Sequence, residues 1–348
     1  MPALTRILKK LPCAAALGVC LIISALPNPA HADDITGDGG SFGEGGTGAN
    51  VNGDKLSVSA GGVVFDHSKN GTGAKAGTLT STTSWTPPPC WHAPKYTPEG
   101  LQKYLEPIWE AGSTGHTWDA EQREKYNAND EKKAFNKDKS GEGYWWGAYV
   151  NDKTFPPGWD SCYEDEYFWV DTGDAPPANI ENAITPEILA QLAYAEIRVP
   201  GTKVTLAPEN ATKVNLPTWA WLDAADFKPV SVTASVPVLG LEATATAEPV
   251  SLQIEPGTKD AVTYPASGVC EINNGRIGEP YAKGKADRTP PCGVKYLRSS
   301  GDDTFPLQAT ITWEIHWTGS GGAGGDLPDG EFGATQDVVV QEIQAINR

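Results

Sequence analysis

Apolar and polar residues alternate along much of the chain after residue 201. Such runs lie at residues 230–236, 241–246, 250–254 and 307–317, and the last places six apolar residues from Leu307 to Trp317 on one side. This period-two pattern is typical of strands with one buried and one solvated face, and turn-forming residues separate the runs. The pattern predicts half-buried antiparallel strands, arranged as a β-sandwich.

The end of the chain adds one strand and one loop to this expectation. Residues 338–340 are three consecutive valines, which predict the closing strand. Residues 319–333 are rich in glycine, so we expect a long, mobile loop between the last two strands.

Two stretches repeat their apolar residues every three or four positions. Thr97 precedes Pro98 and starts a helix expected to run through Trp109. Thr185 is the expected N-cap of a helix from Pro186 to about Ile197, because it precedes proline and an acidic residue. Between these stretches, residues 120–139 alternate in charge and predict a solvated helix or loop.

Aromatic residues are concentrated between positions 144 and 169. In the first interpretation these rings fill the core of a small region at residues 63–180 that a disulfide holds together. In the second, exposed rings stack on the apolar C–H faces of sugars in a cell wall. The candidate binding residues of the second interpretation are Trp145, Trp146, Tyr149, Trp159 and Trp169.

The first 32 residues have the organisation of a secretory signal peptide. A basic start is followed by an apolar run at residues 11–26 and by Ala30-His31-Ala32, after which we expect cleavage. An uncleaved anchor is the alternative, but the apolar run is shorter than the roughly 20 residues of a spanning helix. A lipoprotein signal at Cys20 is a second alternative, which Val19 disfavours because a small residue is needed there. We expect no transmembrane segment after cleavage, and residues 33–62 predict a flexible arm rich in glycine.

Charge narrows the range of partners. The chain has 348 residues and a formal net charge of −17, from 27 Lys and Arg against 44 Asp and Glu. Such an acidic chain is not expected to bind nucleic acid, and it favours basic partners or divalent cations.

Four cysteines remain after the leader is removed: Cys90, Cys162, Cys270 and Cys292. An even number in an exported protein indicates two disulfides, for which three connectivities exist. We favour Cys90–Cys162 and Cys270–Cys292, because each pair then lies within one region. Zinc is the alternative, but the spacing of the cysteines does not match that of zinc ligands. No metal or other cofactor is therefore expected.

Part of the chain resembles the closing strands of a PKD-type immunoglobulin-like domain. The likeness lies in Tyr296, Gly301 and the alternating strand from Phe305 to Trp313, where an aromatic residue precedes a glycine turn and a long strand. It covers roughly residues 228–346, and Glu255-Pro256-Gly257-Thr258 stands where that family has Gly-Asp-Gly. The resemblance implies an immunoglobulin-like sandwich, and our hypothesis is that its edges and loops are presented to an envelope partner.

A broader resemblance runs from about Thr185 to the end of the chain. Residues 214–222, 229–236 and 296–300 are similar to segments of uncharacterised exported proteins of GC-rich Gram-positive bacteria. That family implies an accessory role in the envelope or outside the cell, and some members are encoded near pilus-type or type II-like secretion machinery. Others carry an ATP/GTP-binding label. This chain has no phosphate loop, since its only Gly-Lys pair, Gly284-Lys285, has Glu279 in place of the first glycine.

No catalytic motif stands out from the composition. Cys90 and His92 lie two residues apart, but in this context the cysteine is expected in a disulfide. Glu164, Asp165 and Glu166 lie beside aromatic residues and could serve a glycosidase. In so acidic a chain, such a cluster is better interpreted as a solvated loop, and the lone His316 is expected on the solvent face of its strand.

These observations predict a mainly β protein with a C-terminal immunoglobulin/PKD-like β-sandwich. The expected order is a signal peptide at 1–32, an arm at 33–62, a disulfide-tied aromatic-rich region at 63–180, a helix linker at 181–200 and the sandwich at 201–348. We expect a secreted, non-enzymatic structural or adaptor protein of the cell envelope, accessory to pilus-type or type II-like secretion. The alternatives are a module that binds cell-wall carbohydrate through the rings at 144–169 and a hydrolase using residues 63–180.

Overall fold

The computed structural model describes residues 50–52, 55–57, 62–73, 75–112, 114–150, 155–162, 166–222, 227–273, 275–285 and 287–343. All of them belong to one unit, Asp38–Arg348. The fold is mainly β, as the alternation of residues predicts. The expected signal peptide at 1–32 lies outside the described residues. No described helix has the length and apolar character needed to cross a membrane.

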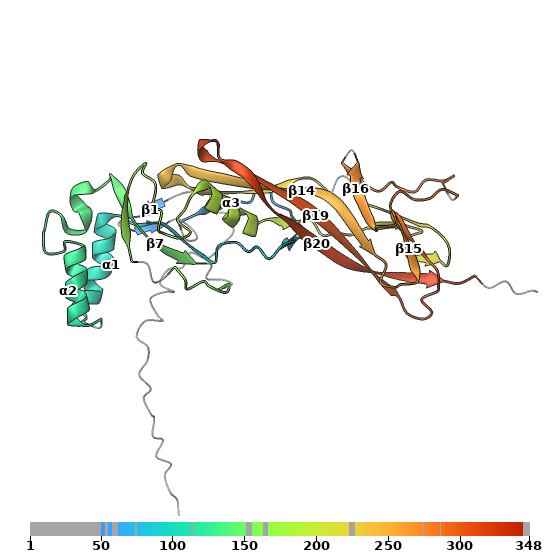
Figure 1. Ribbon diagram of the computed structural model, residues 1–348, viewed down its shortest axis with the longest axis horizontal. Coiled ribbons are helices and arrows are strands. Elements are labelled where there is room, and N and C mark those ends of the chain that lie inside the picture. Colours follow the sequence, from blue (N-terminus) through green and yellow to red (C-terminus); the bar gives the residue numbers. More distant parts are fainter. Residues whose placement is uncertain are drawn as a thin grey trace, which may run out of the picture. The chain divides into compact units, whose positions relative to one another are not determined.

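The largest sheet is built from four long antiparallel neighbours. These are β13 (Val230–Val236), β14 (Leu241–Glu255), β19 (Phe305–Gly319) and β20 (Gly324–Gln341). Figure 1 shows β14, β19 and β20 running side by side. The short strand β3 (Val64–Asp66) extends the sheet beyond β13, and β11 (Ala211–Lys213) pairs in parallel with β20. The sheet therefore includes β3, which lies at the start of the expected aromatic-rich region at 63–180, beside strands from the C-terminal part of the chain.

Two predicted strands are joined into one. The runs at 241–246 and 250–254 both belong to β14, whose register with β19 shifts between Pro249 and Ser251. Proline has no backbone N–H to donate, so the ladder is interrupted there by a β-bulge without ending the strand. The strands expected at 230–236 and 307–317 are confirmed as β13 and β19.

The expectation of a loop at residues 319–333 is wrong. Only a short turn, η3 (Ser320–Gly322), separates β19 from β20, and pairing resumes at Thr318 with Gly324. At some glycines of this segment, a side chain would collide with neighbours. A Cβ on Gly330 would lie 2.7 Å from the Tyr194 hydroxyl, and one on Gly333 would lie 2.6 Å from Oγ1 of Thr310. Close packing explains Gly330 and Gly333, whereas Gly321 and Gly322 in the turn have positive φ, which glycine adopts readily.

The helix α3 (Pro186–Ala195) covers the apolar side of this sheet. Thr185 caps it, since its side chain accepts a hydrogen bond from the backbone N–H of Ile188 at 3.2 Å, as predicted. Leu189 and Leu192 are buried in one hydrophobic core with the alternate apolar residues of the long strands. The even-numbered residues of β19 point to the opposite side and are more exposed.

A second sheet has the order β1-β2-β6-β7-β8. Its strands are β1 (Asn50–Asn52), β2 (Lys55–Ser57), β6 (Cys90–Tyr96), β7 (Gly143–Val150) and β8 (Phe168–Asp171). The strands β1 and β2 fall within the expected arm at 33–62, most of which lies outside the described residues.

Three helical segments accompany this sheet. They are α1 (Pro98–Glu110), α2 (His116–Lys125) and η1 (Ala134–Lys139). The helix α1 begins after its predicted cap, Thr97, which accepts a hydrogen bond from the backbone N–H of Gly100 at 3.1 Å. Leu101, Leu105 and Trp109 form a core with Phe135 and Trp145. The expected solvated helix or loop at 120–139 is helical in α2 and η1, and most of its charged residues are exposed, but Tyr126, Ala134 and Phe135 are buried in this core.

The remaining strands are short. A four-stranded sheet has the order β10 (Thr205–Ala207), β12 (Thr218–Trp221), β18 (Gly293–Tyr296) and β15 (Ala261–Tyr264). The strand β16 (Val269–Asn273) pairs with β14 and β17 (Arg276–Ile277), while β5 (Thr80–Ser81) pairs with β20. β4 (Gly77–Thr78) pairs with β9 (Arg198–Val199), and η2 (Pro237–Leu239) connects β13 to β14.

Candidate functional site

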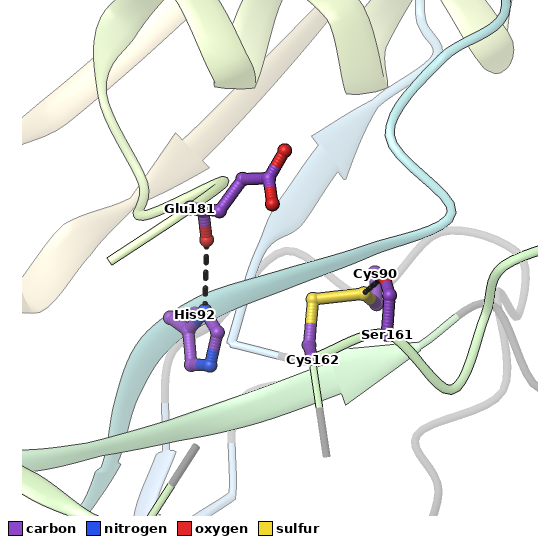
Figure 2. Close-up of a disulfide and its surroundings, with 5 residues drawn as sticks. All are labelled: Cys90, His92, Ser161, Cys162 and Glu181. Carbon is purple, nitrogen blue, oxygen red and sulfur yellow. Dashed lines mark hydrogen bonds between the residues drawn. A yellow bond between two sulfur atoms is a disulfide. The ribbon is translucent and has the colours of Figure 1, made fainter. Parts of the chain in front are cut away.

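The first disulfide joins Cys90, at the start of β6, to Cys162. Both residues are buried, and the Ser161 hydroxyl lies 3.3 Å from the Cys90 sulfur (Figure 2). The bond links residues 72 positions apart, so loop-closure entropy predicts about 4 kcal/mol of stabilisation. Because Cys90 is oxidised, it offers no thiolate for nucleophilic catalysis.

The imidazole of the nearby His92 is buried and hydrogen-bonded within the fold. His92 is fully buried in β6, and its Nδ1–H donates to the Glu181 carbonyl at 3.0 Å (Figure 2). Its backbone N–H also donates to the Asn182 carbonyl, and its carbonyl accepts from Ile184. These three bonds fix residues 181–184 against the edge of β6.

The second disulfide joins Cys270 of β16 to Cys292, which directly precedes β18. It closes a loop with a sequence separation of 22, for which the same entropy argument gives about 3 kcal/mol. Both disulfides follow the pairing favoured from the sequence. The second one connects the large sheet to the four-stranded sheet.

The two adjacent tryptophans of β7 lie in different cores. Successive side chains of a strand point to opposite faces. Trp146 is 1% exposed in the core shared with the long strands, whereas Trp145 is 7% exposed in the core beneath α1. The indole N–H of Trp145 donates to the Phe135 carbonyl at 2.8 Å. Neither ring presents a face on which a sugar could stack.

The other candidate rings are partly buried. Tyr149 donates its hydroxyl to the Pro94 carbonyl at 3.0 Å, and the Lys95 ammonium lies 5.0 Å from its ring. Trp169 donates to the Asp171 carboxylate at 2.7 Å. This hydrogen bond, together with Lys139 nearby, lowers the pKa of Asp171. Trp159 packs edge-on against Phe155.

The five candidate rings therefore do not form one stacking platform. Around them, burial raises the pKa of Tyr96, Tyr126 and Tyr149 above the usual range of tyrosine, and the nearby Tyr167 adds to each effect. These phenols stay neutral at physiological pH.

The acidic residues proposed for a glycosidase are only partly visible. Glu164 and Asp165 lie outside the described residues. Glu166 forms an ion pair with Lys125 and accepts a hydrogen bond from Gln122 at 3.0 Å. Within the described part of the chain, no three His, Cys, Asp or Glu side chains gather closely enough to hold a metal ion.

A feature that the sequence analysis missed is the polar side of the large sheet. The four long strands contain no lysine or arginine, and seven of their carboxylates are exposed on this side. We name this surface the acidic face. It consists of Glu242, Glu248, Glu255, Glu314, Asp326, Glu331 and Asp337.

Register brings the carboxylates together. Glu248 of β14 lies directly opposite Glu314 of β19, and His316 lies opposite Asp326 of β20. No ion pair between described residues involves a member of the acidic face. Directly opposed like charges destabilise a sheet, so the Glu248–Glu314 pair is a local cost to the fold. Residues that break such a rule are candidates for function.

A signal for this surface exists in the sequence. Residues 229–258 and 302–347 both lack lysine and arginine. The pattern became meaningful only with the strand register, which places these two segments on the same sheet.

Comparison with known proteins identified nothing similar: no family model, no curated protein and no solved structure matches the chain.

Proposed function

We propose that this is a secreted adaptor of the cell envelope that recognises a basic protein partner through the acidic face. The observation that carries the proposal is the set of seven exposed carboxylates on one side of strands that contain no lysine or arginine. Such a field attracts a positively charged surface and speeds its association. The resemblance to exported Gram-positive proteins suggests that the partner belongs to pilus-type or type II-like secretion machinery.

Rigidity supports this role. The residues behind the acidic face, such as Ile311, Trp313 and Ile315, are fully buried. The strands from β13 to β20 pair along their lengths, with register shifts only at Pro249–Ser251 and Trp313–Ile315. A surface held this way loses little conformational entropy on binding. Short side chains, including the hydrogen-bonded Thr233 and Thr244, occupy the positions between the carboxylates.

Export is supported by the two disulfides, because such bonds persist in oxidising compartments outside the cytosol. We also propose that the large sheet and the sheet β10-β12-β18-β15 correspond to an immunoglobulin/PKD-like sandwich. The Cys270–Cys292 bond between them supports this arrangement.

A capture experiment tests the proposed function. The disulfide-bonded chain, residues 33–348, is immobilised and exposed separately to purified cell wall and to solubilised envelope proteins of the organism that encodes it. We expect a specific protein to be retained and to elute as salt rises, because exposed charges are screened. Retention on cell-wall polysaccharide instead would contradict the proposal and favour the carbohydrate-binding alternative through Tyr149, Trp159 or Trp169.

Reversing charges on the acidic face tests whether the captured partner binds there. The variant Glu248→Lys/Glu314→Lys should lose the partner. The matched control Glu121→Lys/Glu124→Lys makes the same charge change at two exposed positions of α2 and should retain it. Equal capture by both variants would show that net charge, and not this face, governs binding.

A further inference from the structure

A pocket with a volume of about 380 Å³ lies beside one edge of the large sheet, where Thr80 in its wall pairs with Glu331 of the acidic face. It contains no residue of the aromatic core beneath α1. Its walls come from residues 79–87 and from Tyr194 and Ala195 at the end of α3. The volume lies within the range of roughly 300–1,000 Å³ that is usual for small-molecule sites.

One wall of the pocket is aromatic. The rings of Trp85 and Tyr194 are stacked, with centroids 5.1 Å apart and an angle of 10° between their planes. Tyr194 is held by α3 and is buried, whereas Trp85 is only partly buried. The indole is therefore fixed in orientation by a rigid neighbour while part of it remains accessible.

The other walls are rich in hydroxyl groups. Five of the lining residues between Thr80 and Thr86 carry one. Ser81 and Thr83 bond locally, at 3.2 Å between their oxygens. Among the described residues, no side-chain hydrogen bond is made by the hydroxyls of Thr80, Ser84 or Thr86. These groups can each donate to and accept from a ligand.

The polar end of the Tyr194 ring is buried behind the pocket wall. The Tyr194 hydroxyl is buried and has no hydrogen-bond partner among the described residues. Its ring lines the pocket, and burial with the nearby Asp329 charge raises its pKa to about 12. This oxygen has almost no accessible surface and lies against Gly330 of β20, so we assign it no contact with a ligand.

The chemistry of the lining selects the class of ligand. None of the lining residues is charged, which gives an ionic ligand no partner in a protein that is acidic overall. A neutral sugar carries many hydroxyls and an apolar C–H face that matches an indole ring. We propose that this pocket binds a neutral saccharide, with Trp85 contacting the sugar ring and the hydroxyls between Thr80 and Thr86 bonding its oxygens.

This pocket shares no residue with the acidic face, although Thr80 in its wall lies opposite Glu331 of that face. It also differs from the rings at 144–169, because its aromatic wall is built by Trp85 and Tyr194.

The test is titration of the disulfide-bonded chain with maltotetraose, cellotetraose and the tetramer of N-acetylglucosamine, followed by calorimetry and saturation-transfer NMR. Tetragalacturonate is the anionic comparison. At least one neutral probe should bind, and tetragalacturonate should bind more weakly. Binding should fall about tenfold or more in Trp85→Ala, because it removes a central aromatic contact. Trp118→Ala, which removes a ring that is 42% exposed on α2, should leave binding unchanged.

A second variant guards against misfolding of Trp85→Ala. Ser84 is exposed, so Ser84→Trp should fold normally and fill the pocket. It should abolish saccharide binding while leaving protein capture through the acidic face intact. Saccharide binding by Ser84→Trp equal to that of the unaltered chain, or the failure of all three neutral probes to bind, would overturn the proposal.

Discussion

The sheet β6-β7-β8 and the long sheet of β13, β14, β19 and β20 differ in how many of their faces are buried. The first has hydrophobic cores on both of its faces, filled largely by aromatic rings such as Trp145 and Trp146. The second buries one face with alternate apolar residues and leaves the other polar. A sheet covered on both faces serves as structure, whereas a sheet with one solvated face can also present a recognition surface.

This difference predicts where substitutions are costly. Trp145→Ala and Trp146→Ala should each lower the free energy of unfolding by about 3–5 kcal/mol, although they lie on opposite faces of β7. In the long sheet, Trp313→Ala should cost about as much, but Thr312→Ala on the solvated side should cost less than about 1 kcal/mol. Denaturant unfolding measures all four values. A Trp145→Ala variant as stable as the unaltered chain would show that one face of β7 is not a core.

The two disulfides should contribute different amounts to the free energy of unfolding. Replacing Cys90 and Cys162 by alanine should cost about 4 kcal/mol, and replacing Cys270 and Cys292 should cost about 3 kcal/mol, because the first bond closes the longer loop. Equilibrium unfolding of the two double variants gives the comparison. The reverse order would mean that loop closure does not determine what each bond contributes.

Alkaline pH should affect the aromatic region most. Burial raises the folded-state pKa of Tyr96, Tyr126 and Tyr149 above the value near 10 of an unfolded tyrosine. The folded chain therefore holds these protons longer, and the stability they contribute is present below about pH 10 and is lost as pH rises beyond it.

The Tyr126→Phe variant isolates one of these phenols. It should reduce the loss of stability above pH 10 by up to about 1.4 kcal/mol per pH unit, the value for one proton. Unfolding measured at several alkaline pH values provides the slope. Phe135→Leu, an apolar change in the same core, should leave the slope as it is. An unchanged slope in Tyr126→Phe would contradict the assigned burial.

The helix caps should have smaller and similar effects in both regions. Thr97→Ala at α1 and Thr185→Ala at α3 each remove a side-chain hydrogen bond to the first turn. Each should cost about 1 kcal/mol of stability, measured by thermal or denaturant unfolding. Serine at either position should keep most of the stability, because it retains the hydroxyl that caps the helix. A serine variant as unstable as the alanine variant would show that the threonine methyl group, and not the hydroxyl, is responsible.

The smallest effect should be a gain. Replacing Glu314 by threonine removes the like-charge contact with Glu248 and should stabilise the sheet by roughly 0.2–1 kcal/mol. The same variant should weaken partner capture. A destabilised variant that still binds would contradict both the assigned repulsion and the proposed surface.

The sequence predicted the regular parts of the fold for a physical reason. Residues 230–236 and 307–317 alternate because one face of the sheet is solvated, and Thr97 and Thr185 mark helix starts by local capping chemistry. The strands β6 and β7 show no such alternation, because both of their faces are buried. Their strand character could not be recognised from period alone.

The surfaces depend on contacts between distant residues. Glu248 and Glu314 are opposed through strand register, and Trp85 meets Tyr194 across more than a hundred positions of sequence. The sequence around each of these four residues contains no pattern that predicts such a contact. The glycines at 330 and 333 were misread for the same reason, since the neighbours that require them, Tyr194 and Thr310, come from other elements.

Carboxylate footprinting of the captured complex tests the central claim most directly. The chain is labelled at its carboxyl groups with and without the retained partner, and modification is quantified by mass spectrometry. We predict that Glu248, Glu314 and Glu331 lose most of their labelling in the complex, while Glu121 and Glu124 on α2 are labelled as before. Unchanged labelling of the acidic face, with protection elsewhere on the chain, would contradict the account.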